Sequence, residues 1–299
     1  MEQQATGERE DLCERIVPHL RSWARHNIHF GLSPQAREAW NGMLKEQSPE
    51  DWFQTTLVNV GRASETAFTA LRKARERLPR DTGLTAVVTG GCMLYRFPCG
   101  EPERGGELNG HFLDPGVMAE QVFPLIRMLG PCVRVVLLRI APVYRTERYP
   151  LETFLGKLAR CLEGLPPSYR YAVEIGNPEY LQPEYFACLR ERDAAHMLRD
   201  HLPSPSVLDQ LQMPHALTGD IVLLRGCPEE EETDLLLRSE ARAPAADASL
   251  AVIETVRCCL GEKKTLYAYV DGTPGSFAAL LAALDGDLAK LSPIRMRAA

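Results

Sequence analysis

The sequence lacks an apolar run of the roughly 18 residues that a membrane-spanning helix requires, although 45% of its 299 residues are hydrophobic. Its first residues are polar and acidic, and they contain no apolar segment of the kind found in signal peptides. We therefore predict a cytoplasmic protein that does not enter a membrane.

Closely spaced metal ligands are also missing. The nine cysteines are scattered and none forms a CxxC pair, which argues against the usual zinc and iron–sulfur motifs. His29 and His196 lie in predicted strands, yet neither has a second ligand at a suitable spacing. We predict no bound metal, no cofactor and reduced cysteines.

An excess of positive charge is absent as well. The formal net charge is −6 at pH 7 and the pI is about 5.7. Proteins that bind the phosphate backbone cluster Lys and Arg, so the composition argues against a nucleic-acid partner, although a local basic groove would be compatible with one. The expected partner is a small molecule, and the sequence gives no indication of an oligomeric state.

Nucleotide-binding and hydrolase motifs are missing too. The sequence has no GxGxxG motif, no P-loop and no GxSxG turn for a nucleophilic serine. The first predicted strand ends in Gly31 and Leu32, and Ser33, Pro34 and Gln35 follow it. Dinucleotide binding after this strand is therefore not expected.

What the sequence does contain is a regular alternation of short apolar runs and amphipathic segments. Eight runs are rich in Val, Leu and Ile, which is typical of parallel strands covered by helices. These predicted strands are Ile28–Leu32, Thr56–Val60, Leu84–Thr89, Val133–Ile140, Tyr171–Ile175, Ala194–Leu198, Asp220–Leu224 and Thr265–Val270.

Helical periodicity fills the intervals between these runs. Leu151, Phe154, Leu155, Leu158 and Leu162, for example, fall on one face of a helix. Further helices are predicted near Ala36–Lys45, Glu65–Glu76, Val117–Met128, Glu184–Glu191, Ser206–Leu211, Val252–Leu260 and Phe277–Leu288.

Eight strand–helix units in a chain of this length predict an α/β fold, a (β/α)8 TIM-type barrel. The alternative is an open doubly wound sheet, which a Gly-rich phosphate loop would favour. We predict a single barrel domain over residues 28–292, preceded by an N-terminal helical extension over residues 1–27. The polar stretch Arg96–Gly110 follows the third strand and is either a lid over the active face or a surface insertion.

Glu174 is the most informative single residue. The segment Arg170–Leu181 combines an apolar strand that carries Glu174 with a sharp stop at Asn177 and Pro178. An ionised carboxylate is costly to bury without a partner, so a strand that keeps one indicates a polar site at its end.

Four segments follow one another at a characteristic order and spacing: Val135–Pro142, Tyr171–Leu181, Thr218–Gly226 and Leu266–Ser276. They resemble the motifs of strands four, five, seven and eight of the DUF72 family, also called the YecE-like family. The resemblance extends from Ile28 to about Leu284. It implies a TIM-type barrel of unassigned activity.

The departures from this family's pattern concern polar positions near the strand ends. Glu174 and Asp200 match the pattern. Other positions carry a residue different from the usual one, namely Asn59, Arg139, Asn177, Arg225 and Asp271. The resemblance therefore implies a divergent member, in which a family activity could be altered or lost.

Glu174 and Asp200 are the candidate catalytic residues. They would lie at neighbouring strand ends, where two carboxylates can act as general acid and general base without a metal. The alternative is that Glu174 is a structural carboxylate, ion-paired with Arg139 from the adjacent strand.

Arg139 and Arg225 interrupt apolar strands and would reach the same rim, where guanidinium groups suit a phosphate or carboxylate. Asp271 is either a site carboxylate or a turn residue. The predicted pocket for a small anionic or polyhydroxylated ligand includes Arg139, Arg225 and Asp271. It also includes Asn59 and Asn177, which the resemblance places at motif positions. A barrel that has lost catalysis and acts as a binding or scaffold protein is the competing interpretation.

Overall fold

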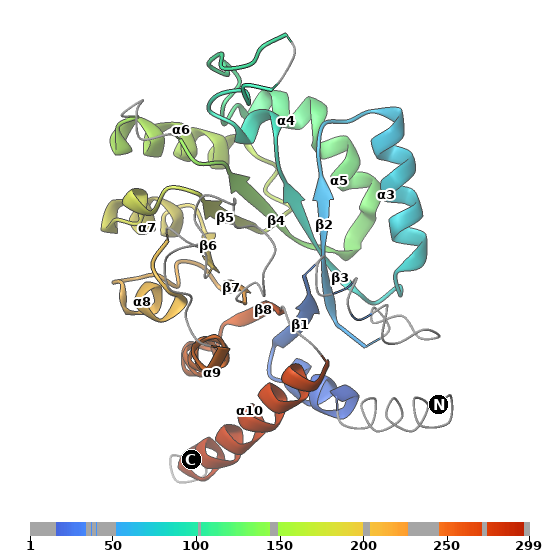
Figure 1. Cartoon of the computed structure of the whole chain (residues 1–299), viewed down its shortest axis with the longest axis vertical. Helices are drawn as coiled ribbons and strands as arrows, with labels where there is room; N and C mark the ends of the chain where they lie inside the picture. Colours follow the sequence, from blue (N-terminus) through green and yellow to red (C-terminus); the bar gives the residue numbers. More distant parts are fainter. Residues whose placement is uncertain are drawn as a thin grey trace.

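The computed structural model is a closed barrel of parallel strands (Figure 1). It describes residues 16–33, 37, 40, 52–100, 103–143, 149–199, 204–226, 245–270 and 274–295. Each strand pairs with the next one in sequence, and β8 pairs with β1, which closes the barrel. The strands are β1 (Ile28–Leu32), β2 (Thr55–Val60), β3 (Gly83–Val88), β4 (Val133–Ile140), β5 (Tyr171–Ile175), β6 (Ala194–Arg199), β7 (Ile221–Arg225) and β8 (Thr265–Val270). The predicted TIM-type fold is confirmed, and the open sheet is excluded.

Helices follow most of the strands and cover the outside of the barrel. They are α3 (Glu65–Arg77), α4 (Pro115–Gln121), α5 (Phe123–Leu129), α6 (Leu151–Gly164), α7 (Pro183–Arg190), α8 (Val207–Gln212), α9 (Ala245–Glu262) and α10 (Pro274–Arg295). The helix predicted near Ala36–Lys45 lies mostly outside the described residues. Over the described part of the chain, no helix is both long enough and apolar enough to cross a membrane.

The prediction of one helix over Val117–Met128 is wrong, because α4 ends at Gln121 and α5 starts at Phe123. Pro124 stands in the first turn of α5. Proline has no N–H to donate and its ring clashes with the preceding turn, so it is tolerated at the start of a helix but not in the middle.

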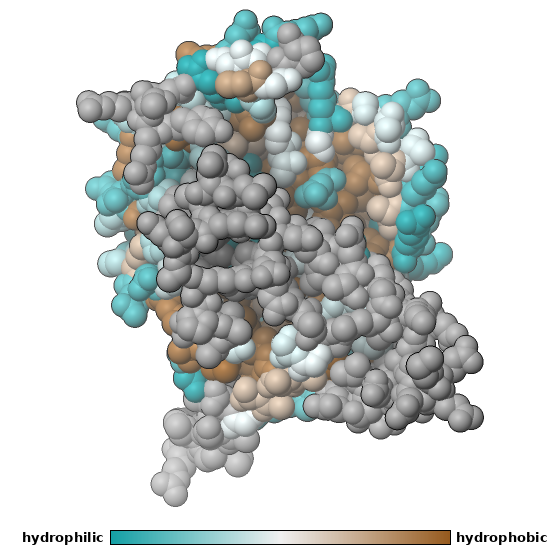
Figure 2. Space-filling model, viewed as in Figure 1, coloured by the Kyte–Doolittle hydropathy of each residue, from teal (hydrophilic) through white to brown (hydrophobic). Residues whose placement is uncertain are grey.

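The interior of the barrel is filled by alternate residues of the strands, as expected from the two-residue period of a strand. This interior cluster consists of Leu57, Val87, Val135, Leu137, Ala172, Ala195, Met197, Ile221, Leu223, Tyr267 and Tyr269. The intervening residues point outward into two further clusters beneath the helices. Figure 2 shows that the outer edge of α3, which is rich in charged residues, is hydrophilic.

The N-terminal helical residues 16–24 pack against α10. Ile16, Leu20 and Trp23 are buried in the same cluster as Leu281 and Leu284. The indole of Trp23 donates a hydrogen bond of 2.9 Å to Asp285, which also contacts His19. The helix thus covers the β1 and β8 side of the barrel.

The seam between β1 and β2, where these two strands pair, is short. Inside the barrel, the side chain of Tyr269 on β8 reaches across it to β2 and β3. Only Gly31 and Leu32 pair with β2, opposite Thr55 and Thr56. The hydroxyl of Tyr269 donates to Thr85 on β3 at 2.5 Å and lies 3.1 Å from the hydroxyl of Thr55. A Cβ atom on Gly31 would lie 2.4 Å from the carbonyl oxygen of Thr55 and 3.0 Å from the ring of Tyr269.

Gly31→Ala is therefore expected to lower the free energy of unfolding by about 1–3 kcal/mol, because the added methyl group meets backbone rather than a movable side chain. The measurement is urea unfolding followed by circular dichroism. Gly61→Ala is the matched control, since a Cβ at Gly61 would meet no atom within 4 Å. Equal stabilities of the two variants would contradict the close packing at the seam.

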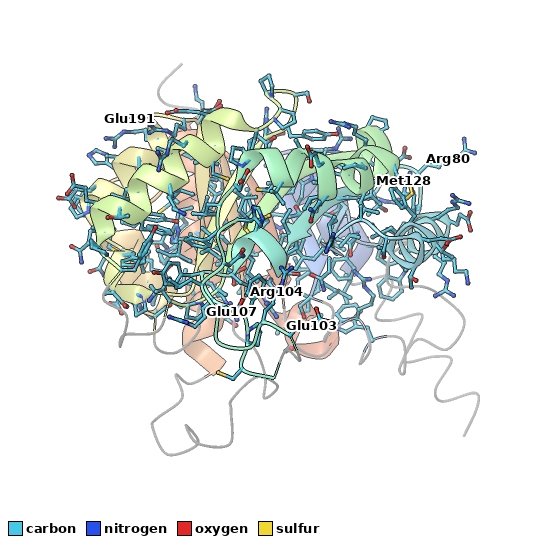
Figure 3. All side chains as sticks on the ribbon, turned by 90° about the horizontal axis from the view of Figure 1, so that it is seen from above. Arg80, Glu103, Arg104, Glu107, Met128 and Glu191 are labelled. Atoms are coloured by element: carbon cyan, nitrogen blue, oxygen red, sulfur yellow. The ribbon has the colours of Figure 1, made fainter. Side chains whose placement is uncertain are left out.

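Within the predicted loop Arg96–Gly110, the described residues 96–100 and 103–110 form the two arms of a hairpin at the edge of the barrel. Arg96 and Leu108 form an antiparallel bridge, and Asn109 fixes the base through hydrogen bonds of 2.9 and 2.8 Å to the carbonyl oxygens of Gly91 and Leu94. Figure 3 shows Glu103, Arg104 and Glu107 together on this hairpin, and all are exposed.

Candidate functional site

Polar side chains replace the apolar interior of the barrel at its C-terminal rim. On each of several strands a polar residue stands two positions after an interior residue, so its side chain points to the same side of the strand. These rim residues are Asn59, Arg139, Glu174, Arg199 and Arg225. The C-terminal ends of the strands meet at one face of a barrel, which brings polar groups from distant parts of the chain together.

Glu174 is the centre of this arrangement. Its side chain is only 4% exposed, and it accepts a 2.7 Å hydrogen bond from Nε of Arg139, its neighbour in register on β4. Its other carboxylate oxygen accepts a hydrogen bond from Nη1 of Arg199 on β6. A single buried carboxylate therefore holds two guanidinium groups. They come from β4 and β6, the strands that flank β5 (Figure 1).

The protonation state of Glu174 follows from this pairing. Burial alone raises the pKa of a carboxyl group, because it disfavours the charged form. Arg139, Arg199 and the nearby Arg225 outweigh burial and lower the pKa of Glu174 below its ordinary value. Glu174 is therefore an ionised carboxylate at neutral pH.

A cavity of about 320 Å3 opens beside these groups. It is lined by Thr89, Gly90, Arg139, Ile140, Ala141, Pro142, Glu174, Ile175, Gly176, Leu181, His196, Met197, Arg199, Ser204 and Gln210. The side chains of Arg139 and Arg199 are 28% and 22% exposed, so both reach the cavity while they hold Glu174.

Both arginines keep hydrogen-bond donors for a further partner. A guanidinium group carries five N–H donors, and Glu174 takes one from Arg139 and one from Arg199. Among the described residues, neither guanidinium group makes another hydrogen bond. The remaining donors are suited to bidentate binding of a carboxylate or phosphate.

His196 and Gln210 form a buried relay behind Arg199. The amide nitrogen of Gln210 donates to the carbonyl oxygens of Arg199 and Pro205, both at 2.7 Å, so its amide oxygen must accept. It accepts from Nε2 of His196 at 3.1 Å, and Nδ1 of His196 in turn accepts from the hydroxyl of Tyr185 at 3.1 Å. The relay fixes the backbone that carries Arg199.

Burial determines the charge of His196. It lowers the pKa of the imidazole to about 4, against smaller opposing effects of Gln210 and Glu174. His196 is therefore neutral at pH 7 and carries its proton on Nε2.

Comparison with known proteins identifies the family. The model of a family described as "Protein of unknown function DUF72" matches residues 106–292, well over half of the chain. The chain belongs to the DUF72 family. The predicted resemblance is thereby confirmed.

Two solved DUF72 structures match this chain, and the first of them supports the shared fold. A DUF72 family protein from Thermotoga maritima MSB8 superposes with a TM-score of 0.53 at 17% identity, over 88% of this chain and 99% of that one. A DUF72 family protein from Enterococcus faecalis V583 gives a TM-score of 0.48 at 15% identity, over 88% and 97%. No curated protein matches the sequence. The low identities agree with a divergent DUF72 member.

The two residues that follow β5, Gly176 and Asn177, have structural explanations. At Gly176, a Cβ atom would lie 2.6 Å from the ring of Pro142, so glycine allows these two walls of the cavity to meet. The amide of Asn177 exchanges hydrogen bonds of 2.7 and 2.8 Å with the backbone N–H and carbonyl of Val143, and donates one of 2.9 Å to Glu179. Asn177 thus joins the chain after β5 to the chain after β4, and it does not line the cavity.

Asn177→Ala is accordingly expected to lower the free energy of unfolding by about 2 kcal/mol, because two backbone groups of the buried Val143 lose their partner. Urea unfolding measures this change. Asn59→Ala provides the comparison: Asn59 is exposed on β2, and its replacement is expected to change stability by less than about 0.5 kcal/mol. A larger loss from Asn59→Ala than from Asn177→Ala would contradict these assignments.

The other predicted site residues of this DUF72 chain lie either away from the cavity lining or outside the described residues. Arg225 is buried on β7, in register with Arg199, and does not line the cavity. Asn59 is at the rim but also does not line the cavity. Asp200 and Asp271 lie outside the described residues. No group of three potential metal ligands from His, Cys, Asp and Glu occurs within the described part of the chain.

Arg199 is the site residue that the sequence analysis missed. The predicted sixth strand ended at Leu198, whereas β6 continues to Arg199. The two-residue period of a strand indicates Arg199 as a rim residue, because it stands two residues after the interior Met197, as Arg139 does after Leu137.

Proposed function

We propose that this DUF72 barrel binds a small anionic molecule at the C-terminal rim, through Arg139 and Arg199. The observation that carries the proposal is that both guanidinium groups share the buried carboxylate of Glu174 and keep further donors at the edge of a cavity. Glu174 then acts as a positioning residue, which fixes both arginines before the ligand arrives.

The same geometry weighs against Glu174 as a general acid. A general acid needs a proton at the working pH, and the pKa of Glu174 is lowered. The lowered pKa also makes Glu174 a weak base, because the paired arginines stabilise its charged form. Metal-independent acid–base chemistry that includes Asp200 stays a prediction, as does the cytoplasmic location.

A scaffold without a ligand is the second candidate, because both arginines are already ion-paired within the protein. In a scaffold these ion pairs would serve stability alone. The two candidates differ in whether anions bind to the folded protein at this rim.

Arg199→Gln is expected to weaken the binding of small anions at least tenfold, with thermal stabilisation by phosphate, acetate and benzoate as the measurement. The wild-type protein should show a rise in melting temperature that depends on anion concentration, because a ligand that binds only the folded state stabilises it.

Arg192→Gln is the matched control for this experiment. Arg192 also pairs with a carboxylate, Glu163, at 2.7 Å, but it does not line the cavity. It should keep the wild-type response to anions. An identical response of all three proteins would support the scaffold instead.

A further inference from the structure

The hydrogen-bond donors that remain available in the cavity are concentrated on Arg139 and Arg199. His196 and Gln210 line the cavity, but both ring nitrogens of His196 and all groups of the Gln210 amide are already engaged within the protein. The donors that remain with Arg139 and Arg199 therefore dominate the recognition of a polar group. A ligand with polar groups along its whole length would leave most of them without a partner.

Apart from Thr89 and Ser204, the other side chains among the described lining residues are apolar or absent. Ile140, Pro142, Ile175, Leu181 and Met197 line the cavity, and no Phe, Tyr or Trp side chain is present among the described lining residues. Aliphatic walls favour a hydrocarbon group through burial of apolar surface. They lack the flat aromatic face on which a nucleobase or a sugar ring would stack.

The charge at the cavity sets the charge of the head group. Arg139 and Arg199 contribute two positive charges and Glu174 contributes one negative charge, which leaves one net positive charge among these lining residues. A monoanion neutralises the charge of these lining residues, whereas a dianion such as a phosphate monoester exceeds it. Arg225 also lies near Glu174 but does not line the cavity.

From these three observations we infer that the ligand is a compact monocarboxylate with an aliphatic body. The carboxylate takes the free donors of Arg139 and Arg199, and the body lies against Pro142, Leu181 and Met197. A cavity of about 320 Å3 suits a branched or cyclic hydrocarbon group of small size. This inference rests on the proposed anion-binding function and narrows its ligand class.

Four probes measure the contribution of the charged head group separately from that of the hydrocarbon body. They are cyclohexanecarboxylate, the neutral cyclohexylmethanol, the hydrophilic carboxylate glycerate and the dianion cyclohexyl phosphate. Isothermal titration calorimetry on the wild-type protein is expected to give the tightest binding for cyclohexanecarboxylate, at least tenfold tighter than for each of the other three.

Two variants test the two ends of the cavity separately. Arg199→Gln should weaken cyclohexanecarboxylate at least tenfold but leave cyclohexylmethanol unchanged. Leu181→Ala should weaken the three cyclohexyl probes several-fold but leave glycerate unchanged. Arg192→Gln should bind all four probes as the wild type does.

The outcomes distinguish this inference from the proposed function. Glycerate or cyclohexyl phosphate binding as tightly as cyclohexanecarboxylate, with loss in Arg199→Gln, would overturn the aliphatic monocarboxylate and leave anion binding in place. Cyclohexylmethanol binding as tightly as the carboxylate would overturn the role of the charge. If none of the three anions binds to the wild-type protein, both proposals are overturned.

Discussion

Replacement of Glu174 by glutamine is expected to lower the free energy of unfolding by about 3 kcal/mol, because removal of one member of a buried ion pair leaves the other members without compensation. Arg139 and Arg199 would both lose their partner, and each is only partly accessible to water. Their exposed fractions of 28% and 22% place the effect at the lower end of the range for buried pairs. Urea unfolding at pH 7 measures it.

The same substitution should strengthen anion binding, because the gain in positive charge outweighs the loss of the residue that positions the two arginines. Loss of the negative charge of Glu174 frees donors on both arginines and raises the local positive potential, so added phosphate or benzoate should restore part of the lost stability. A general acid or base would behave differently, since its replacement would remove chemistry without improving affinity for anions.

Glu163→Gln is the control for both effects. It removes a carboxylate that also binds an arginine, Arg192, but its side chain is 57% exposed. Exposed ion pairs contribute about 0–1 kcal/mol, so a small loss and no response to anions are expected. If Glu163→Gln and Glu174→Gln cost the same, the buried carboxylate does not organise the rim as described.

The barrel could be predicted closely because its strands are buried on both faces. The bounds of β1, β4, β5 and β8 agree with the predicted runs to the residue, since polar or turn residues flank each apolar run. The pairing of Glu174 with Arg139, one of the two alternatives drawn from the sequence, also follows from strand order and parity. Both residues point inward at the rim of adjacent strands, and they are direct partners in register.

Other parts of the site depend on contacts that no local pattern contains. Arg199 is not predicted from the sequence, because a charged residue is typical of the end of an apolar strand; its backbone nevertheless pairs with β7 opposite Arg225. Asn177 fits a turn by its sequence, whereas its side chain satisfies the backbone of Val143, 34 residues earlier. Both cases require the closed barrel before the role of the side chain can be assigned.

The largest pH effect on stability is expected from His196. Its pKa is 6.5 in an unfolded chain and about 4 in the folded barrel. Between these values the unfolded chain takes up a proton that the folded protein does not, so stability falls as the pH falls from 6.5 to about 4 and is fully present above 6.5. At about 1.4 kcal/mol per pH unit the loss reaches about 3 kcal/mol.

The measurement is the free energy of unfolding in urea at several pH values between 7 and 4.5. Glu174 adds little in this range, because a carboxylate with a lowered pKa loses its contribution only below its ordinary value of 4.5. His29 acts in the same direction as His196, since burial and the nearby Arg134 lower its pKa. The slope therefore has a main contribution from His196 and a smaller one from His29.

His196→Gln should remove most of this slope, although it also lowers stability at every pH because the relay from Tyr185 to Gln210 is disturbed. The slope, rather than the absolute stability, is the decisive quantity, because loss of packing alone would not change the number of protons taken up on unfolding. His215→Asn controls for a histidine outside the relay: His215 is exposed at a φ of 63°, which asparagine tolerates, and the wild-type slope should remain. A His196→Gln variant that retains the full slope would show that His196 is charged within the barrel, and the assigned direction of the hydrogen bonds to Tyr185 and Gln210 would then be wrong.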